Sequence, residues 1–169
     1  IIAAQMSAAG LLAERTNTNL AVALGAAAGA ADLARAHGGV GADAANVAQA
    51  AAQSAPVVAA AVLNRQGEIE AITDANYAGL ARAALGNAGS AGVWVGAASE
   101  ADATAPVLVR HVGERAIVSV LDPSRLLPEL NAEARVLITS AEGAVVYLSP
   151  ALEAAGGAAQ QQLQQADHR

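Results

Sequence analysis

Three short segments of this chain share one pattern, in which an apolar run, a polar turn with a glycine and a second apolar run follow one another. They read VLNRQGEIEAIT at 62–73, VLVRHVGERAIVSVL at 107–121 and VLITSAEGAVVYL at 136–148. Two strands joined by so few polar residues form a β-hairpin, in which the glycine supplies the positive φ of the turn. Because the strands of a hairpin run antiparallel, the pattern predicts an antiparallel sheet and argues against a parallel nucleotide-binding sheet.

Helical segments precede, separate and follow these hairpins. Residues 1–36 are rich in strong helix formers at helical spacing, although TNTN at 16–19 favours a kink or a cap. Asp122 followed by Pro123 is typical of a helix start. We expect further helices at 43–53 (capped by Asp43), 76–85, 122–130 and 151–166, a flexible loop at 86–92, and strands at 57–63, 68–73, 93–97, 107–112, 115–121, 135–139 and 144–148.

The order of these elements predicts the fold class. We expect an α+β fold, in which a long N-terminal helix and flanking helices cover an antiparallel sheet. The hairpin at 135–149 either extends that sheet or begins a neighbouring module, because too few residues follow it here for a duplicated domain. We divide the chain into an N-terminal helical region (1–55), a core (56–150) and a C-terminal helix (151–169).

Small side chains dominate the apolar positions. Hydrophobic residues make up 54% of the 169 residues, but the chain has no Phe, one Trp and two Tyr. Alanine and valine supply little volume per residue, so the elements must approach closely and be stabilised by many small contacts. The bias toward alanine and arginine (all nine basic residues are Arg) indicates mainly a high-GC genome.

Charge and residue content exclude several classes of protein. A net charge of −6 offers no basic patch for nucleic acid. The absence of cysteine excludes disulfide scaffolds and thiolate metal sites, and the absence of lysine excludes a Walker loop. The chain has no run of 18 apolar residues, and its first residues lack the basic start and the cleavage pattern of a signal peptide, so we expect none in this segment. Since the chain begins without Met and ends abruptly, we expect it to be an excised part of a larger protein.

In this order, the segments resemble the extracytoplasmic PAS-like sensor domains called Cache domains. The resemblance covers about 57–150 and the helix before it, and no single segment is a strict motif. The alanine- and arginine-rich style is similar to that of alphaproteobacterial sensor histidine kinases of the PleC type. The resemblance rests on the helix at 1–36, the first hairpin, the strand GVWVGA at 92–97 leading into PVLVRHVGERAIVSVLDPSRLL, and VLITSAEGAVVYLSP.

The resemblance implies a function. Such domains sit between two membrane helices, so we expect a periplasmic input domain of an inner-membrane sensor histidine kinase in a two-component system, with no catalysis and no cofactor of its own. The alternative is a partner-binding or dimerisation module of a chemoreceptor or cyclic-dinucleotide enzyme without a small-molecule ligand. In both cases we expect a homodimer through the N-terminal helix, where LGAAAGAA at 24–31 permits close approach of a second helix or of its own sheet.

Arg110 is the first candidate for binding a ligand. It alternates with Leu108 and Val112, so its guanidinium shares an apolar face and could clamp a small carboxylate or a phosphate. Alternatively, Arg110 is a hairpin-end residue that reaches solvent or pairs with Glu114. The aromatic, basic and Asp residues with which amino-acid-binding relatives hold their ligand do not map onto this chain.

Three further residues complete the candidate ligand site. Trp94 is either a pocket wall or, more often for such a residue, part of the core. Tyr77 and Arg82 lie on the helix that would cover a pocket. If no small carboxylate binds, the expected partner is a periplasmic protein.

The sequence predicts neither a metal site nor catalysis. A hydrolase, the third hypothesis, would need a nucleophile and a base that converge in space. Glu68 and Glu70 share one strand face, which is more typical of a solvated face than of an acid–base pair. The serines 119 and 149 lack the nucleophile-elbow context, and the histidines 37, 111 and 168 lack metal-ligand spacing.

Overall fold

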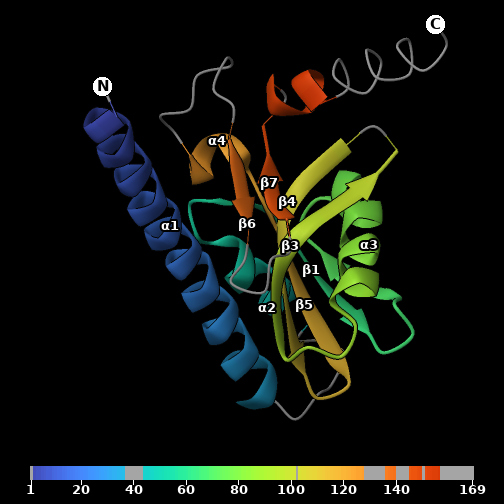
Figure 1. The fold of residues 1–169 in the computed structure, drawn as a ribbon. Coiled ribbons are helices and arrows are strands. Elements are labelled where there is room, and N and C mark those ends of the chain that lie inside the picture. The colour runs from blue at the N-terminus through green and yellow to red at the C-terminus, as the bar shows by residue number, and fades with distance from the viewer. Residues whose placement is uncertain are drawn as a thin grey trace, which may run out of the picture.

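A five-stranded antiparallel sheet with the order β2-β1-β5-β4-β3 forms the centre of the molecule (Figure 1). The computed structural model describes residues 2–36, 44–101, 103–127, 136–139, 145–149 and 151–156, and side chains from residue 10 onward. The sheet and the helices on both its faces confirm the predicted α+β fold. The strands are β1 (Val57–Asn64), β2 (Ile69–Ile72), β3 (Val93–Glu100), β4 (Ala103–Val112) and β5 (Arg115–Leu121); the helices are α1 (Ile2–Ala36), α2 (Ala44–Ala52), α3 (Ala78–Ala88) and α4 (Pro123–Leu126), with the 3-10 helix η2 (Ala75–Tyr77) before α3.

The hairpin turns form at the predicted glycines. Gly67 between β1 and β2 has a φ of 81°, and Gly113 between β4 and β5 has a φ of 59°. These are left-handed conformations in which a side chain is disfavoured, so glycine is required at both turns. The β1–β2 and β4–β5 pairings are antiparallel, as the sequence predicts.

α1 packs on one face of the sheet through a stripe of alanines. Ala23, Ala27 and Ala30 follow one another at helical spacing and are fully buried. Ala23 and Ala30 share one core with α2 and with apolar residues of β1 and β5. Because the alanine side chain is short, the helix lies close to the sheet, as the composition predicts. The core on this face is therefore built jointly by the N-terminal helices and the sheet.

The segment TNTN at 16–19 does not end α1, which continues through it as one helix of 35 residues. The hydroxyl of Thr16 donates to the carbonyl oxygen of Leu12 at 2.8 Å, and that of Thr18 donates to Glu14 at 2.9 Å. Hydroxyls that bond to the preceding turn are compatible with a helix interior. The prediction of a cap at 16–19 is therefore wrong, because tertiary packing outweighs the local preference.

α3 covers the opposite face of the sheet. Leu80, Ala81 and Ala84 are buried and share a second core with β1, β4 and β5. The helix begins after η2, where the carboxylate of Asp74 accepts a hydrogen bond from the Asn76 amide at 3.0 Å. It continues to Ala88, so the loop predicted for 86–92 begins three residues later than expected.

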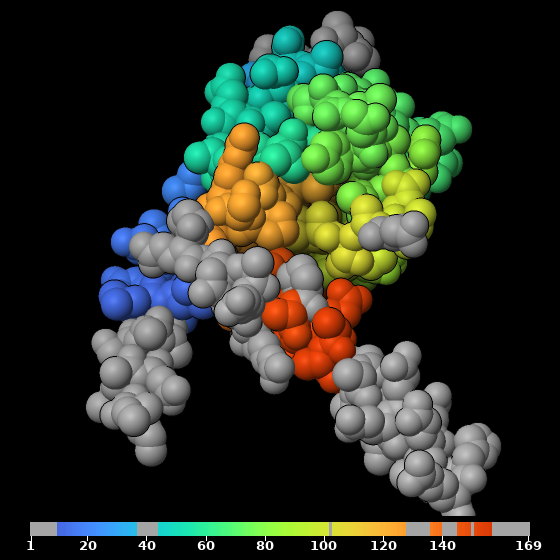
Figure 2. All heavy atoms as spheres, turned by 90° about the horizontal axis from the view of Figure 1, so that it is seen from above, coloured from blue at the N-terminus to red at the C-terminus, as the bar shows by residue number. Residues whose placement is uncertain are grey.

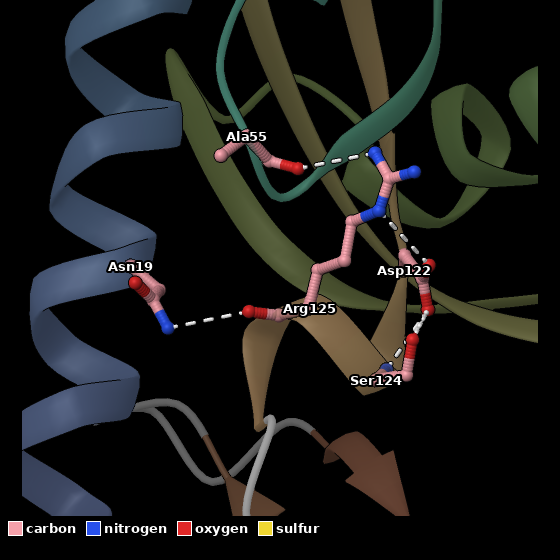
Figure 3. A network of polar contacts seen from close by, with 5 residues as sticks. All are labelled: Asn19, Ala55, Asp122, Ser124 and Arg125. Carbon is pink, nitrogen blue, oxygen red and sulfur yellow. Dashed lines mark hydrogen bonds and ion pairs between the residues drawn. The ribbon is translucent and has the colours of Figure 1, made fainter.

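A group of polar contacts joins α1 to α4 and β5 (Figure 3). The amide nitrogen Nδ2 of Asn19 donates to the backbone oxygens of Leu126 at 2.9 Å and Arg125 at 3.4 Å. Asp122 caps α4, as predicted, by accepting from the Ser124 amide at 2.8 Å. The guanidinium of Arg125 lies 3.4 Å from the Asp122 carboxylate and donates to the carbonyl of Ala55 at 3.4 Å. Seen from above, α4 and the end of β5 lie between α1 and the β3–β4 hairpin (Figure 2).

The electrostatics of Asp122 follow from these contacts. Partial burial raises the pKa of the carboxyl, but the Ser124 hydroxyl and amide and the charge of Arg125 stabilise the carboxylate more strongly. The net effect is a pKa below the usual value of an aspartate. Asp122 therefore caps α4 in its ionised form at neutral pH.

The third hairpin does not extend the central sheet. β6 (Leu137–Thr139) and β7 (Val145–Leu148) form a separate two-stranded sheet. β7 lies against β3 and β4, and Ile138 and Tyr147 pack on the core beneath α1. This hairpin thus covers the part of the sheet that α1 and α2 leave open.

The N-terminal part of α1 and the helical residues 151–156 lie at the same end of the molecule (Figure 1). α4 and its contacts to Asn19 are found toward this end as well. Across the part of the chain that the structure describes, no helix combines the length and the hydropathy needed to cross a membrane. The predicted cap Asp43 and the histidines 37 and 168 lie outside the described residues.

Candidate functional site

The structure places the four predicted site residues on different sides of the sheet. Arg110 lies opposite Ile117 of β5, which belongs to the core beneath α1 and α2. Trp94 lies opposite Val109, which belongs to the core beneath α3. Tyr77 packs on the same α3 side as Trp94. The sheet therefore separates Arg110 from the two aromatic residues, and these residues do not line one common pocket.

The surroundings of these residues differ as well. The ring of Trp94 lies over Gly96, where a Cβ atom would come within 2.2 Å of Cζ2. Trp94 is therefore packed into the wall of the α3-side core, while Arg82 is exposed on α3. Glu114, the alternative partner considered for Arg110, instead holds Arg65 with 3.2 Å between Nη1 and Oε2.

A cleft of about 610 Å³ opens between the C-terminal end of α3 and the tips of the β1–β2 and β4–β5 hairpins. This volume is within the range of pockets that hold small molecules. Leu85 and Ala116 supply apolar wall, and Arg65, Arg115 and Glu114 supply charge. We name this feature the hairpin cleft, and it is the candidate functional site.

His111 is the most informative residue of the hairpin cleft. It lies opposite Ala116 on β5, on the side of the sheet that faces α3. Its Nε2 atom is buried and has no hydrogen-bond partner within the described structure. A buried polar atom without a partner costs about 1–3 kcal/mol, so such atoms are rare unless a ligand or a water pairs with them.

The rim of the cleft is fixed by the β1–β2 turn. The Oδ1 atom of Asn64 accepts from the amides of Gln66 and Glu68, each at 2.9 Å. These bonds fold the turn around the Asn64 side chain and so place Arg65 at the mouth of the cleft. The ion pair of Arg65 with Glu114 is exposed, with 78% and 77% of the two side chains accessible, so it contributes little stability.

A second ion pair anchors Arg115 behind the cleft. Its Nε lies 2.7 Å from Oε2 of Glu70, and only 15% and 29% of these side chains are exposed. Glu70 is therefore bound to an arginine, while Glu68 accepts from Nδ2 of Asn64 at 2.8 Å. The two glutamates are thus engaged separately and do not form an acid–base pair.

The described residues contain no group of three His, Asp or Glu side chains placed to hold a metal ion. In that same part of the chain, Nε2 of His111 accepts no hydrogen bond from a serine or threonine hydroxyl. The hairpin cleft offers hydrogen-bond donors, charge and a short apolar wall. This chemistry suits reversible binding of a small molecule.

The sequence contains only a weak signal for this cleft. His111 alternates with Val107 and Val109, which are both completely buried, so the strand period places it on a core face. The approach of α3 to two hairpin tips depends on tertiary packing, which no local pattern encodes. The sequence therefore identified the neighbouring Arg110 and assigned no role to His111.

No family model, no curated protein and no solved structure matches this chain.

Proposed function

We propose that this chain is the extracytoplasmic signal-sensing input domain of an inner-membrane sensor histidine kinase in a two-component system, and that it is not itself an enzyme. The observation that carries the proposal is the position of α1 and of residues 151–156, which leave the body at the same end (Figure 1). A domain inserted between two membrane helices needs both connections on one side. The Cache-like order of its segments supports the same function.

The contacts of α1 offer a route for the signal. α1 is about 52 Å long, since each helical residue adds about 1.5 Å. The alanine stripe attaches it to the sheet, and Asn19 bonds it to α4 directly after β5. A ligand that shifts β5 or α4 would therefore move α1 relative to residues 151–156. Packed helices switch between discrete arrangements, so a small shift suffices.

The first test is the full-length protein. We expect hydrophobic spans on both sides of this segment and a histidine kinase after the second span. The phosphorylation output of that protein in membranes should change in Asn19→Ala, which loses the bond to α4, and stay unchanged in Asn17→Ala, which alters an exposed neighbour. The absence of either span, or equal output from both variants and the wild type, would contradict the proposal.

A second candidate function, a dimerisation module, is favoured by the outer face of α1. Gly25 and Gly29 are exposed, and a Cβ atom at either position would meet nothing within 4 Å. Glycine inside a helix costs about 0.5–1 kcal/mol relative to alanine, and nothing in the described monomer requires it here. Leu11 and Val22 are 58% and 49% exposed on the same face. These positions suit close approach of α1 from a second copy.

Analytical sedimentation measures dimerisation through this face of α1 directly. We expect the chain to dimerise and Gly25→Leu to shift it toward monomer, because the new side chain would hold the two helices apart. Ala13→Leu adds the same side chain on a different side of α1 and serves as the control. A monomer at all concentrations, or equal association of both variants, would exclude dimerisation through this face.

A further inference from the structure

We propose that the hairpin cleft binds a small oxyanion, a carboxylate or a phosphate, through His111 Nε2 and the guanidinium of Arg65. The inference rests on the proposed sensing function, for which it supplies the chemical class of the ligand. It moves the binding site from Arg110, on the α1 side of the sheet, to His111, on the α3 side.

His111 determines which kind of atom the ligand presents. With a hydrogen on Nε2, the imidazole donates one hydrogen bond, and the described residues provide no acceptor for it. A carboxylate or phosphate oxygen is the strongest acceptor available to such a donor. Because Nε2 is buried, the ring must turn toward the cleft when the anion enters. Binding then supplies a partner to a polar atom that has none among the described residues.

Arg65 supplies the charge. It already holds the carboxylate of Glu114 at the mouth of the cleft, which demonstrates that its guanidinium can take an oxyanion there. Because that pair is largely exposed, exchange of Glu114 for a ligand anion costs little. Asn64 holds the backbone of the turn in place during such an exchange.

The remaining wall selects an anion with a short apolar part. Arg65, Arg115 and Glu114 line the cleft, but Arg115 is already neutralised by Glu70, so the positive charge that a ligand can use is that of Arg65. The C-terminal carbonyls of α3 repel negative charge, which places the anionic head against the hairpin tips. Leu85 and Ala116 then lie beside the rest of the ligand.

The experiment combines calorimetry with NMR of the histidine ring nitrogens in the whole chain. Butyrate and inorganic phosphate are titrated separately, with chloride at equal ionic strength as the reference. We expect one of the two anions to bind and to shift the His111 ring signals. His111→Leu and Arg65→Gln should each weaken binding about tenfold, the effect of one lost charged hydrogen bond. Arg82→Gln removes an exposed arginine outside the lining and should bind like the wild type.

The outcomes separate this inference from the proposed function. No binding of either anion at tens of millimolar, or equal weakening in Arg65→Gln and Arg82→Gln, would overturn the oxyanion site. Arg65→Gln is decisive even if His111→Leu fails to fold, because Arg65 is exposed. A full-length kinase that still responds to Asn19→Ala would then keep the sensing function with another ligand. Binding by the domain without any kinase response would support the site and reject the sensing function.

Discussion

Substitution of Gly96 by alanine tests the packing of the only tryptophan against β3. A Cβ atom at this position would lie 2.2 Å from Cζ2, 2.4 Å from Cη2 and 2.9 Å from Cε2 of Trp94. Carbon atoms in contact prefer separations of about 3.5–4.0 Å, so the indole ring has to move. It cannot move inward, because Val107 lies opposite Gly96 and is fully buried.

The magnitude follows from two opposing effects. Insertion of a methyl group into a well-packed contact costs about 1–3 kcal/mol. Replacement of glycine by alanine in a strand raises the free energy of unfolding by about 0.5–1 kcal/mol, because alanine restricts the unfolded chain. Because a Cβ atom only 2.2 Å from the ring places the cost in the upper part of that range, we expect Gly96→Ala to lower the free energy of unfolding by about 1–2 kcal/mol. For a chain of this size, the melting temperature falls by about 2–8 °C.

Circular dichroism gives the melting temperature, and fluorescence reports the ring itself, because Trp94 is the only tryptophan. We expect the emission of Gly96→Ala to change as the ring leaves its site. Gly86→Ala is the matched control, since a Cβ atom there meets nothing within 4 Å. It should leave stability unchanged or raise it by up to about 1 kcal/mol. In a Trp94→Leu background, the cost of Gly96→Ala should fall sharply.

Two results would refute this reasoning. The first is a Gly96→Ala variant that is as stable as Gly86→Ala with unchanged emission. The second is an equal cost of Gly96→Ala in the presence and absence of the Trp94 ring. Either would mean that the ring does not lie over Gly96 in solution.

Three further substitutions test other contacts. Asn19→Ala should lower the free energy of unfolding by about 1 kcal/mol through loss of the bond to α4, whereas Asn17→Ala, with no such bond, should cost nothing in chemical denaturation. Asp122→Ala should cost about 1 kcal/mol at pH 7. Because the folded pKa of Asp122 is lowered, this difference should begin to shrink below about pH 4, where the unfolded carboxyl binds a proton, and shrink further at the lower pH at which the folded carboxyl is protonated. Gly25→Ala together with Gly29→Ala should raise the melting temperature of dilute protein, since both positions are open and helical.

Local signals predicted the fold because each depends on few residues. A glycine between two apolar runs predicted the turns at Gly67 and Gly113, and Asp122 before Pro123 predicted the start of α4. The strand at 115–121 has the predicted bounds. By contrast, β3 continues to Glu100, beyond its predicted end at residue 97, and β4 begins at Ala103, before its predicted start at residue 107. Their added residues are mainly alanine, which favours helices and is depleted in strands, with serine and threonine, so pairing with the neighbouring strand and not local preference fixes their conformation.

The candidate site was less predictable, because it arises where distant segments meet. The strand period assigns Arg110 and His111 to opposite faces, but it does not say which face has a cleft. The answer depends on where α3 ends relative to the two hairpin tips, which the sequence placed three residues too early. The bond from Asn19 to Leu126 likewise spans more than a hundred residues and has no local pattern.

Some glycines of this chain are required by the structure of the monomer, and others are not. Gly67 and Gly113 are required by a positive φ, and Gly96 by the tryptophan ring above it. Gly25 and Gly29 have ordinary helical φ values, open space around them and a position on the outer face of α1. They weaken the helix, and no contact within the described monomer compensates for this loss. We therefore look for their role in a partner that contacts the outer face of α1. A second α1 at close range would supply that reason, and the sedimentation of Gly25→Leu against Ala13→Leu decides it.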